Sequence, residues 1–90
     1  MKHLNITVFG KVQGVFFRAA TKAVANQLQV TGFVKNLPDG SVYIEAEGDA
    51  FGLENFLEWC HEGPEHAVVE KVEINSGELK NYNNFEILKR

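Results

Sequence analysis

Alternating apolar and polar residues open the chain and predict a strand over about residues 3–10. Leu4, Ile6 and Val8 alternate in this segment with Asn5, Thr7 and Phe9. A period of two residues is typical of a strand that buries one face. The spacing then lengthens to three or four residues at Phe17, Ala20, Val24 and Leu28, as in a helix with one apolar face. We therefore expect the first helix to run from about Phe17 to Gln29.

A hairpin follows the first helix. Residues 30–36 are typical of a strand, and residues 42–47 alternate between apolar and polar side chains. Pro38-Asp39-Gly40 lies between these segments and supplies a preset φ, a local hydrogen bonder and a residue that tolerates positive φ. This region therefore predicts two strands joined by a tight turn.

The second half of the chain predicts one more helix and two more strands. Asp49 can cap a helix that ends at Gly63-Pro64. The apolar stripe of this helix consists of Leu53, Phe56, Leu57 and Cys60. A fourth strand is expected to place Val68, Glu70, Val72 and Ile74 on one face, although the charge of Glu70 interrupts the pattern. Phe85-Glu86-Ile87 predicts a short final strand.

The order of these elements predicts an α+β protein with the ferredoxin-like split βαβ arrangement, βαββαβ plus a short C-terminal strand. Two helices would cover one face of an antiparallel sheet. With 90 residues, no internal repeat and no linker, we expect a single domain over residues 1–90. Many unrelated activities share this fold, so the arrangement by itself does not indicate a function.

Composition and charge argue against several classes of protein. Nine Lys and Arg against twelve Asp and Glu give a formal charge of -3, and no basic block provides the surface of a nucleic-acid binder. No apolar stretch approaches the ~20 residues needed to cross a membrane, and polar residues interrupt the first segment too early for a signal peptide. The single cysteine, Cys60, permits no intramolecular disulfide, which suits a reducing compartment. We expect a cytoplasmic monomer that binds neither nucleic acid nor membranes.

The segment between the first strand and the first helix can bind an anion. Gly10 and Gly14 allow sharp backbone turns, and the unpaired N–H groups at a helix start favour negative charge. The candidate phosphate-binding residues are Gln13, Gly14, Val15, Phe16, Phe17 and Arg18. On glycine spacing alone, an ordinary strand-to-helix turn is the simpler explanation, because the spacing matches neither a dinucleotide-binding fingerprint nor a P-loop.

Arg18 and Asn36 are the candidate catalytic residues. A cation in the first turn of a helix opposes the helix dipole, so Arg18 indicates an anion that its planar guanidinium could hold with two hydrogen bonds. The amide of Asn36, at the end of the second strand, could hold a water molecule in line with a bound phosphate. Each residue also has a plainer explanation: a surface arginine with its stem over Phe17, and an asparagine that serves the turn.

Two long motifs resemble those of the acylphosphatase family. The run GKVQGVFFR over residues 10–18 is similar to the first motif of that family, and GFVKNLPDGSVYIEAEG over residues 32–48 is similar to the second. The likeness extends more loosely to Gly63-Pro64 and Phe85-Glu86-Ile87, so it covers nearly the whole chain. The resemblance implies that Arg18 binds the phosphate together with the loop amides and that Asn36 positions the attacking water.

The resemblance also implies an activity, the metal-independent hydrolysis of acyl phosphates to a carboxylate and inorganic phosphate by direct attack of water. We expect no cofactor and no metal, because His3, His61 and His66 lack metal-ligand spacing. A covalent phospho-enzyme is not expected either, since Ser41 is the only Ser, Cys or His inside the motifs. Inorganic phosphate and sulfate should act as inhibitors. A non-catalytic anion-binding module and an RNA-binding domain of the same topology remain as alternatives.

Overall fold

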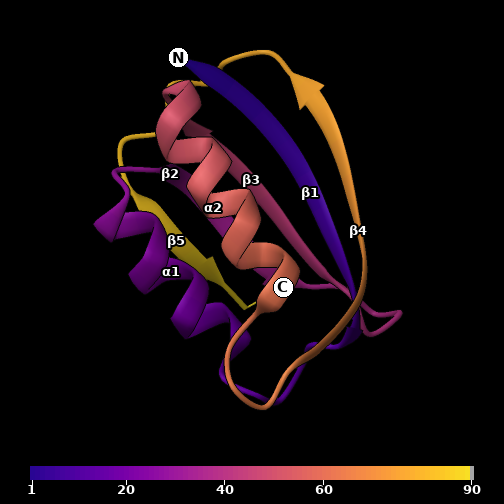
Figure 1. Ribbon diagram of the computed structural model, residues 1–90. Helices are drawn as coiled ribbons and strands as arrows, with labels where there is room; N and C mark the ends of the chain where they lie inside the picture. Colours follow the sequence, from indigo (N-terminus) through magenta and orange to yellow (C-terminus); the bar gives the residue numbers. More distant parts are fainter. Residues whose placement is uncertain (90) are drawn as a thin grey trace.

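The secondary-structure elements follow the predicted order in the computed structural model, which describes residues 1–89 (Figure 1). They are β1 (Lys2–Lys11), α1 (Phe17–Gln27), β2 (Thr31–Asn36), β3 (Val42–Gly48), α2 (Ala50–Glu62), β4 (Val68–Gly77) and β5 (Phe85–Leu88). The strands form one sheet, and both helices pack against the same face of it (Figure 1). The α+β class and the βαββαβ order with a short final strand are therefore confirmed.

The sheet is mixed rather than entirely antiparallel, which corrects one detail of the prediction. Its strand order is β4-β1-β3-β2-β5, and the pairs among the first four strands of this order are antiparallel. β5 instead lies parallel to β2, with Phe85 opposite Gly32. The path of the chain explains this, because β4 ends at the same end of the sheet at which β2 begins. Residues 78–84 cross to the far edge there, so β5 runs in the direction of β2.

The core lies between the sheet and the two helices. Six of the sheet residues that face the helices are fully buried, namely Ile6, Val8, Val34, Val42, Ile44 and Ala46. The helices contribute Phe17, Ala25, Leu53, Phe56 and Cys60. Burial of one branched or aromatic side chain stabilises a fold by about 1.5–3 kcal/mol, so this layer fixes where the loops leave the sheet. Cys60 is a core residue as predicted, whereas Leu57 is only partly buried.

The predicted pattern of inward residues in β4 is wrong for the first part of the strand. The expected inward face consisted of Val68, Glu70, Val72 and Ile74. In the structure Val69 and Val72 pack against the core, whereas Val68 is 55% exposed and Ile74 is 41% exposed. Ile74 nevertheless lies on the same face as Val72, because it pairs with the buried Ile6 as Val72 pairs with the buried Val8. Only the start of the strand departs from the expectation, since its inward residue is Val69 rather than Val68 or Glu70.

A β-bulge between β1 and β4 causes this change of phase. Phe9 pairs with Lys71 and Gly10 pairs with Val69, which leaves Glu70 as the extra residue of β4. Gly10 has φ 131, and a Cβ atom at this position would lie 2.1 Å from the carbonyl oxygen of Val68. Only glycine fits opposite the bulge, directly before the loop that leads to α1.

The helix ends show how local sequence sets the boundaries. α2 is capped as predicted, because Oδ1 of Asp49 accepts a hydrogen bond of 2.7 Å from the backbone N–H of Gly52. Gly63, with φ 71, ends this helix. α1 ends at Gln27, two residues before the predicted end, because Gln29 has φ 59, a left-handed conformation that cannot continue a helix.

The outer face of the sheet, opposite the helices, carries a buried polar network. The connection between β4 and β5 lies over this face, where the buried Glu47 carboxylate accepts hydrogen bonds from two of its backbone N–H groups. These belong to Lys80, at 2.6 Å, and Tyr82, at 3.2 Å. Nδ1 of His3 lies 2.6 Å from Glu47 Oε2, and the Tyr82 hydroxyl donates to Glu45 at 2.6 Å. The connection thus buries polar residues of β1 and β3.

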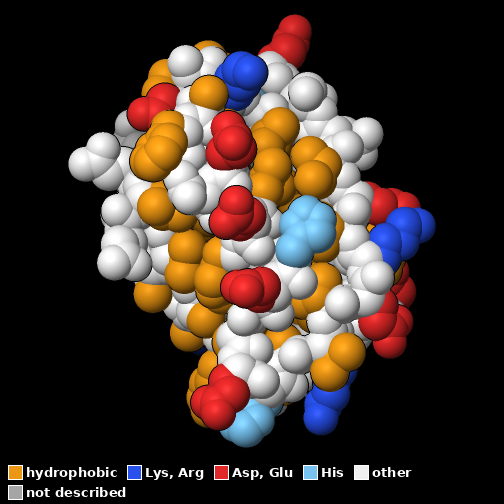
Figure 2. All heavy atoms as spheres, in the orientation of Figure 1, with side chains coloured by type: hydrophobic (Ala, Val, Ile, Leu, Met, Phe, Trp, Pro, Cys, Tyr) orange, Lys and Arg blue, Asp and Glu red, His pale blue; other side chains and the backbone are white. Residues whose placement is uncertain are grey.

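The outer surface of α2 is acidic. Figure 2 shows the helix side of the molecule, where acidic side chains lie in a row along this helix. The acidic residues of α2 are Glu54, Glu58 and Glu62, and all three are exposed. This surface does not offer the positive charge that nucleic-acid phosphates require. Within residues 1–89, no helix has the length and apolar character needed to cross a membrane.

Candidate active site

The loop between β1 and α1 has a backbone suited to an anion. Gly14 has φ 74 and Phe16 has φ 60, whereas Val15 between them does not have a positive φ. Alternation of left- and right-handed conformations turns successive N–H groups toward one side and forms an anion-binding concavity. The left-handed conformations of Gly14 and Phe16 therefore fit the role of an anion-binding loop.

The N–H groups of this loop and of the first turn of α1 are unpaired. The first helical hydrogen bond runs from the Ala20 N–H to the carbonyl oxygen of Phe16, at 3.0 Å. Among residues 1–89, no oxygen accepts a hydrogen bond from a backbone N–H group of residues 13–19. α1 also lacks the side-chain cap that α2 has, and no acidic residue lies in its first turn. These donors add to the positive end of the helix dipole, so the loop attracts an anion.

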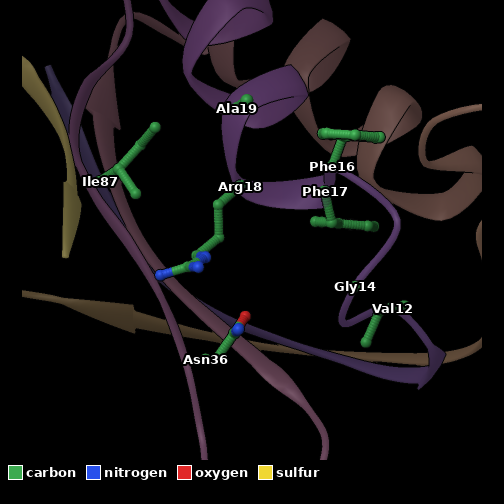
Figure 3. A pocket seen from close by; sticks show the side chains of 8 residues that line it. All are labelled: Val12, Gly14, Phe16, Phe17, Arg18, Ala19, Asn36 and Ile87. Carbon is green, nitrogen blue, oxygen red and sulfur yellow. The ribbon is translucent and has the colours of Figure 1, made fainter. Parts of the chain in front are cut away.

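Arg18 extends from the first turn of α1 toward the end of β2 (Figure 3). Its Nη1 donates a hydrogen bond of 3.0 Å to the carbonyl oxygen of Leu88 in β5. This contact directs the guanidinium into the cavity between the two strands and the loop. Because it uses one of five N–H groups, the others can bind an anion.

Asn36 is the last residue of β2, and its side-chain amide points toward the guanidinium of Arg18 (Figure 3). The adjacent turn is held by other groups. The Asp39 carboxylate accepts hydrogen bonds from the backbone N–H and the hydroxyl of Ser41. The N–H of Leu37 donates to the Ser41 carbonyl. Since no hydrogen bond of the Asn36 side chain occurs within residues 1–89, the turn does not account for this residue.

Two cavities meet at Asn36. The smaller, of about 320 Å³, is lined by Val12, Gly14, Phe16, Phe17, Arg18, Ala19, Asn36 and Ile87 (Figure 3). The larger, of about 640 Å³, is lined by Gln13, Lys35, Asn36, Leu37, Pro38 and Lys89. The structure therefore brings both candidate catalytic residues into the smaller cavity together with much of the candidate phosphate-binding loop. Gln13 lines only the larger cavity and Val15 lines neither.

Gln13 joins the loop to the hairpin beside Asn36, a role that the sequence analysis missed. Its side-chain NH₂ group donates hydrogen bonds of 2.8 Å to the carbonyl oxygens of both Leu37 and Ser41. The contact fixes the anion-binding loop relative to Asn36. Because the acceptors are main-chain carbonyl oxygens, which every residue possesses, no sequence pattern could have revealed them.

Other reactive side chains lie outside the smaller cavity. Cys60 is buried in the core, where burial raises the pKa of its thiol to about 12. His61 and His66 are exposed as expected, and His3 belongs to the network on the outer face of the sheet. Among residues 1–89, no group of three His, Cys, Asp or Glu side chains could hold a metal ion. The smaller cavity instead offers a guanidinium and N–H donors, which suit a tetrahedral oxyanion.

Comparison with known proteins agrees with this geometry. The model of the acylphosphatase family matches residues 4–87. An acylphosphatase of Marinobacter nauticus is 56% identical over 68 residues, which cover 76% of this chain and 74% of that protein. An acylphosphatase of Archaeoglobus fulgidus is 49% identical, with 93% of this chain and 94% of that protein covered. The crystal structure of acylphosphatase from Bacillus subtilis matches with a TM-score of 0.95 at 34% identity and covers 98% of this chain and 99% of that one.

These comparisons confirm the resemblance that the two sequence motifs carry. The family model spans nearly the whole chain, and the relatives are similar over most of their own length. The solved structure has the same fold throughout. The comparisons also confirm the enzyme class that we expected from the motifs, a hydrolase that acts as an acylphosphatase. This chain belongs to the acylphosphatase family.

Proposed function

We propose that this protein hydrolyses acyl phosphates to a carboxylate and inorganic phosphate, without a metal ion, by direct attack of water at phosphorus. The observation that carries the proposal is the meeting of Arg18, the unpaired loop amides and Asn36 in one cavity. A cation and N–H donors bind the phosphoryl oxygens, and a neutral amide faces them. This is the set of groups that a transfer of a phosphoryl group to water requires.

The phosphoryl group binds between the loop and Arg18. Its equatorial oxygens accept hydrogen bonds from the N–H groups of residues 13–17 and from the free N–H groups of the guanidinium. These donors are fixed before the substrate arrives, because Leu88 holds Arg18 and Gln13 holds the loop against the hairpin. A preorganised site of this kind stabilises the charge that spreads over these oxygens in the transition state.

Asn36 holds the water molecule that attacks. The water oxygen forms a bond to phosphorus while the bond from phosphorus to the acyl oxygen breaks, and its electron pair leaves with the carboxylate. One proton of the water remains on the new phosphate oxygen, and the other passes to a phosphate oxygen or to solvent. A carboxylate is a good leaving group, so no general acid is needed.

Two other functions fit the structure less well. A non-catalytic anion-binding module would need the loop and Arg18 but has no use for the unpaired amide of Asn36 in the same cavity. An RNA-binding domain would need free aromatic rings on the outer face of the sheet. On this face the ring of Phe33 packs against those of Tyr43 and Tyr82, with 5.9 Å between ring centroids in each pair, next to the buried Glu45 and Glu47.

The proposal also includes the oligomeric state, the location, the substrate and the inhibitors of the enzyme. It works as a monomer in the cytoplasm, as one domain over residues 1–90, and uses a small acyl phosphate as its substrate. Inorganic phosphate and sulfate compete with the substrate, because the loop recognises a tetrahedral anion.

Phosphate release from benzoyl phosphate and acetyl phosphate, measured with and without a chelator, tests the proposed reaction. We expect turnover of both compounds, unchanged by the chelator, and competitive inhibition by inorganic phosphate. Activity that is lost with the chelator and restored by Mg²⁺ or Zn²⁺ would refute the metal-independent reaction. Absence of turnover, with phosphate still bound, would identify the non-catalytic alternative.

A further inference from the structure

Phe16 is a large apolar side chain that the fold itself does not use. It is 83% exposed, whereas the adjacent Phe17 is 2% exposed and packs against Trp59 at a distance of 5.5 Å between ring centroids. Within residues 1–89, Phe16 takes part in none of the aromatic pairs. Its ring lies in solvent at the border of the cavity that contains Arg18 and Asn36 (Figure 3).

The backbone conformation of Phe16 is unusual for an aromatic residue. Its φ of 60 and ψ of 25 are left-handed, a conformation that glycine or asparagine adopts more readily than an aromatic residue. The anion-binding loop requires a left-handed backbone at residue 16, but this backbone conformation does not require a phenyl side chain. A strained, exposed aromatic side chain at the rim of a cavity therefore indicates a ligand for the ring.

We propose that the ring of Phe16 binds the acyl group of the substrate and makes the enzyme prefer acyl phosphates with an apolar, aromatic acyl group. This inference rests on the proposed function, because the position of the acyl group follows from the direction of attack. Water held by Asn36 must approach phosphorus opposite the bond that breaks. The acyl group therefore leaves on the side away from Asn36.

The wall on that side of the cavity is apolar. In Figure 3, Asn36 lies at one end of the cavity, Ala19 and Phe16 lie toward the other, and Arg18 lies between them. Ile87, which is 39% exposed, adds a further apolar side chain to this lining. Among residues 1–89, the lining of this cavity contains no charged side chain other than the guanidinium that binds the phosphoryl group.

The alternative direction would select a different substrate. The larger cavity on the other side of Asn36 is lined by two cationic residues, Lys35 and Lys89. An acyl group bound there would be recognised by its negative charge, as in an acyl phosphate with a second carboxylate. The two directions thus predict opposite preferences, aromatic or anionic.

The test compares kcat/KM for benzoyl, acetyl and succinyl phosphate in the parent, in Phe16→Ala and in Phe51→Ala. Phe51 is the matched control, because it is 76% exposed but lies on α2 and lines neither cavity. We expect the ratio of benzoyl to acetyl phosphate to fall by about tenfold in Phe16→Ala and to stay unchanged in Phe51→Ala. Any loss caused by a disturbed loop is common to both substrates and cancels in this ratio. Phe16→Trp, which keeps an aromatic ring, should keep the ratio near that of the parent.

The outcomes separate this inference from the proposed function. A parent enzyme that hydrolyses none of the three compounds refutes both. A parent enzyme that is active, with a benzoyl to acetyl ratio that Phe16→Ala leaves unchanged, refutes the role of Phe16 alone. A preference for succinyl phosphate that disappears in Lys35→Ala or Lys89→Ala would place the acyl group in the larger cavity and also overturn the inference.

Discussion

Arg18 and Leu88 are joined by a hydrogen bond of 3.0 Å from the guanidinium Nη1 to the main-chain carbonyl oxygen. One residue lies in the first turn of the first helix and the other ends the last strand, so the contact connects these two elements. The parallel pairing of β5 with β2 is what brings the carbonyl group to this place. The final strand thus contributes to the candidate active site through this carbonyl group as well as through Ile87, which lines the smaller cavity.

Replacement of Arg18 by Lys keeps the positive charge but removes both the planar group and the contact with Leu88. We expect phosphate affinity and kcat to fall together, each by about tenfold or more, because a lysine cannot form the paired hydrogen bonds of a guanidinium. Calorimetry with inorganic phosphate and steady-state kinetics provide the measurements. Lys22→Ala, an exposed cation on the same helix, is the control. If Arg18→Lys bound phosphate as tightly as the parent, the anion site would have to lie elsewhere.

Replacement of Gln13 by Met should weaken both the fold and the reaction. The change removes two hydrogen bonds of 2.8 Å to Leu37 and Ser41. At about 0.5–1.5 kcal/mol each, their loss should lower the free energy of unfolding by about 1–3 kcal/mol. The loop would also move relative to Asn36, so kcat should fall by about tenfold. Urea denaturation and kinetics test this, with the exposed Gln27→Met as control, and unchanged values in both would show that the contact is incidental.

Replacement of Gly10 by Ala should be far more destabilising than replacement of Gly40 by Ala. Both glycines have positive φ, 131 and 94. A Cβ atom at Gly10 would lie 2.1 Å from the carbonyl oxygen of Val68, whereas at Gly40 it would meet no atom within 4 Å. We expect a loss of about 1–2 kcal/mol at Gly40 from the backbone conformation, and at least twice that at Gly10. Equal losses in urea denaturation would contradict the bulge that the structure places opposite Gly10.

The buried Glu47 should make the protein less stable in acid. Burial raises the pKa of this carboxyl, but hydrogen bonds from the Lys80 N–H, from His3 and from the Tyr82 N–H outweigh it and hold the pKa below the ordinary value of 4.5. Between the lowered pKa and the ordinary one, the unfolded chain binds more protons than the folded protein. The contribution of Glu47 to stability is therefore complete above the ordinary pKa and is lost as the pH falls through the lowered one.

Glu47→Gln tests this contribution. The variant should unfold more easily at neutral pH, by about 1–3 kcal/mol, and its stability should depend less than that of the parent on pH as the pH falls below the ordinary carboxyl pKa of 4.5. Urea denaturation across this range provides the measurement, and the exposed Glu54→Gln is the control. Identical pH dependence in parent and variant would mean that Glu47 has an ordinary pKa in the folded protein.

Much of the fold could be predicted because local patterns determine it. The alternation in β1, the cap at Asp49 and the turn at Pro38-Asp39-Gly40 each act within a few residues. The direction of β5 could not be predicted, because it depends on which edge of the sheet residues 78–84 reach. Which residues of β4 face the core depends on a β-bulge. The charge of Glu70 marked the position of this bulge in the sequence but did not reveal that a bulge was present.

The candidate site was predictable where side-chain chemistry carries it. Arg18 stands out in the sequence because a cation at a helix start calls for an explanation, whereas an asparagine before a turn does not, and Asn36 was singled out by the resemblance to the acylphosphatase motifs. The structure places both residues in one cavity. The contacts of Gln13 and of Leu88 could not be found in this way, since both depend on main-chain carbonyl oxygens. Phe16 was expected to contribute only its N–H group, because exposure of its ring depends on the left-handed backbone.

The central claim is that Arg18 and the loop bind the phosphoryl group while Asn36 holds the attacking water. The most direct test measures phosphate affinity and the single-turnover rate with benzoyl phosphate in Asn36→Ala, with circular dichroism to verify folding and the exposed Asn26→Ala as the matched control. We predict phosphate affinity within about threefold of the parent and a single-turnover rate lower by about 10²-fold or more, because the anion site is intact and the water is misplaced. A folded Asn36→Ala protein that turns over at nearly the parent rate would contradict the claim.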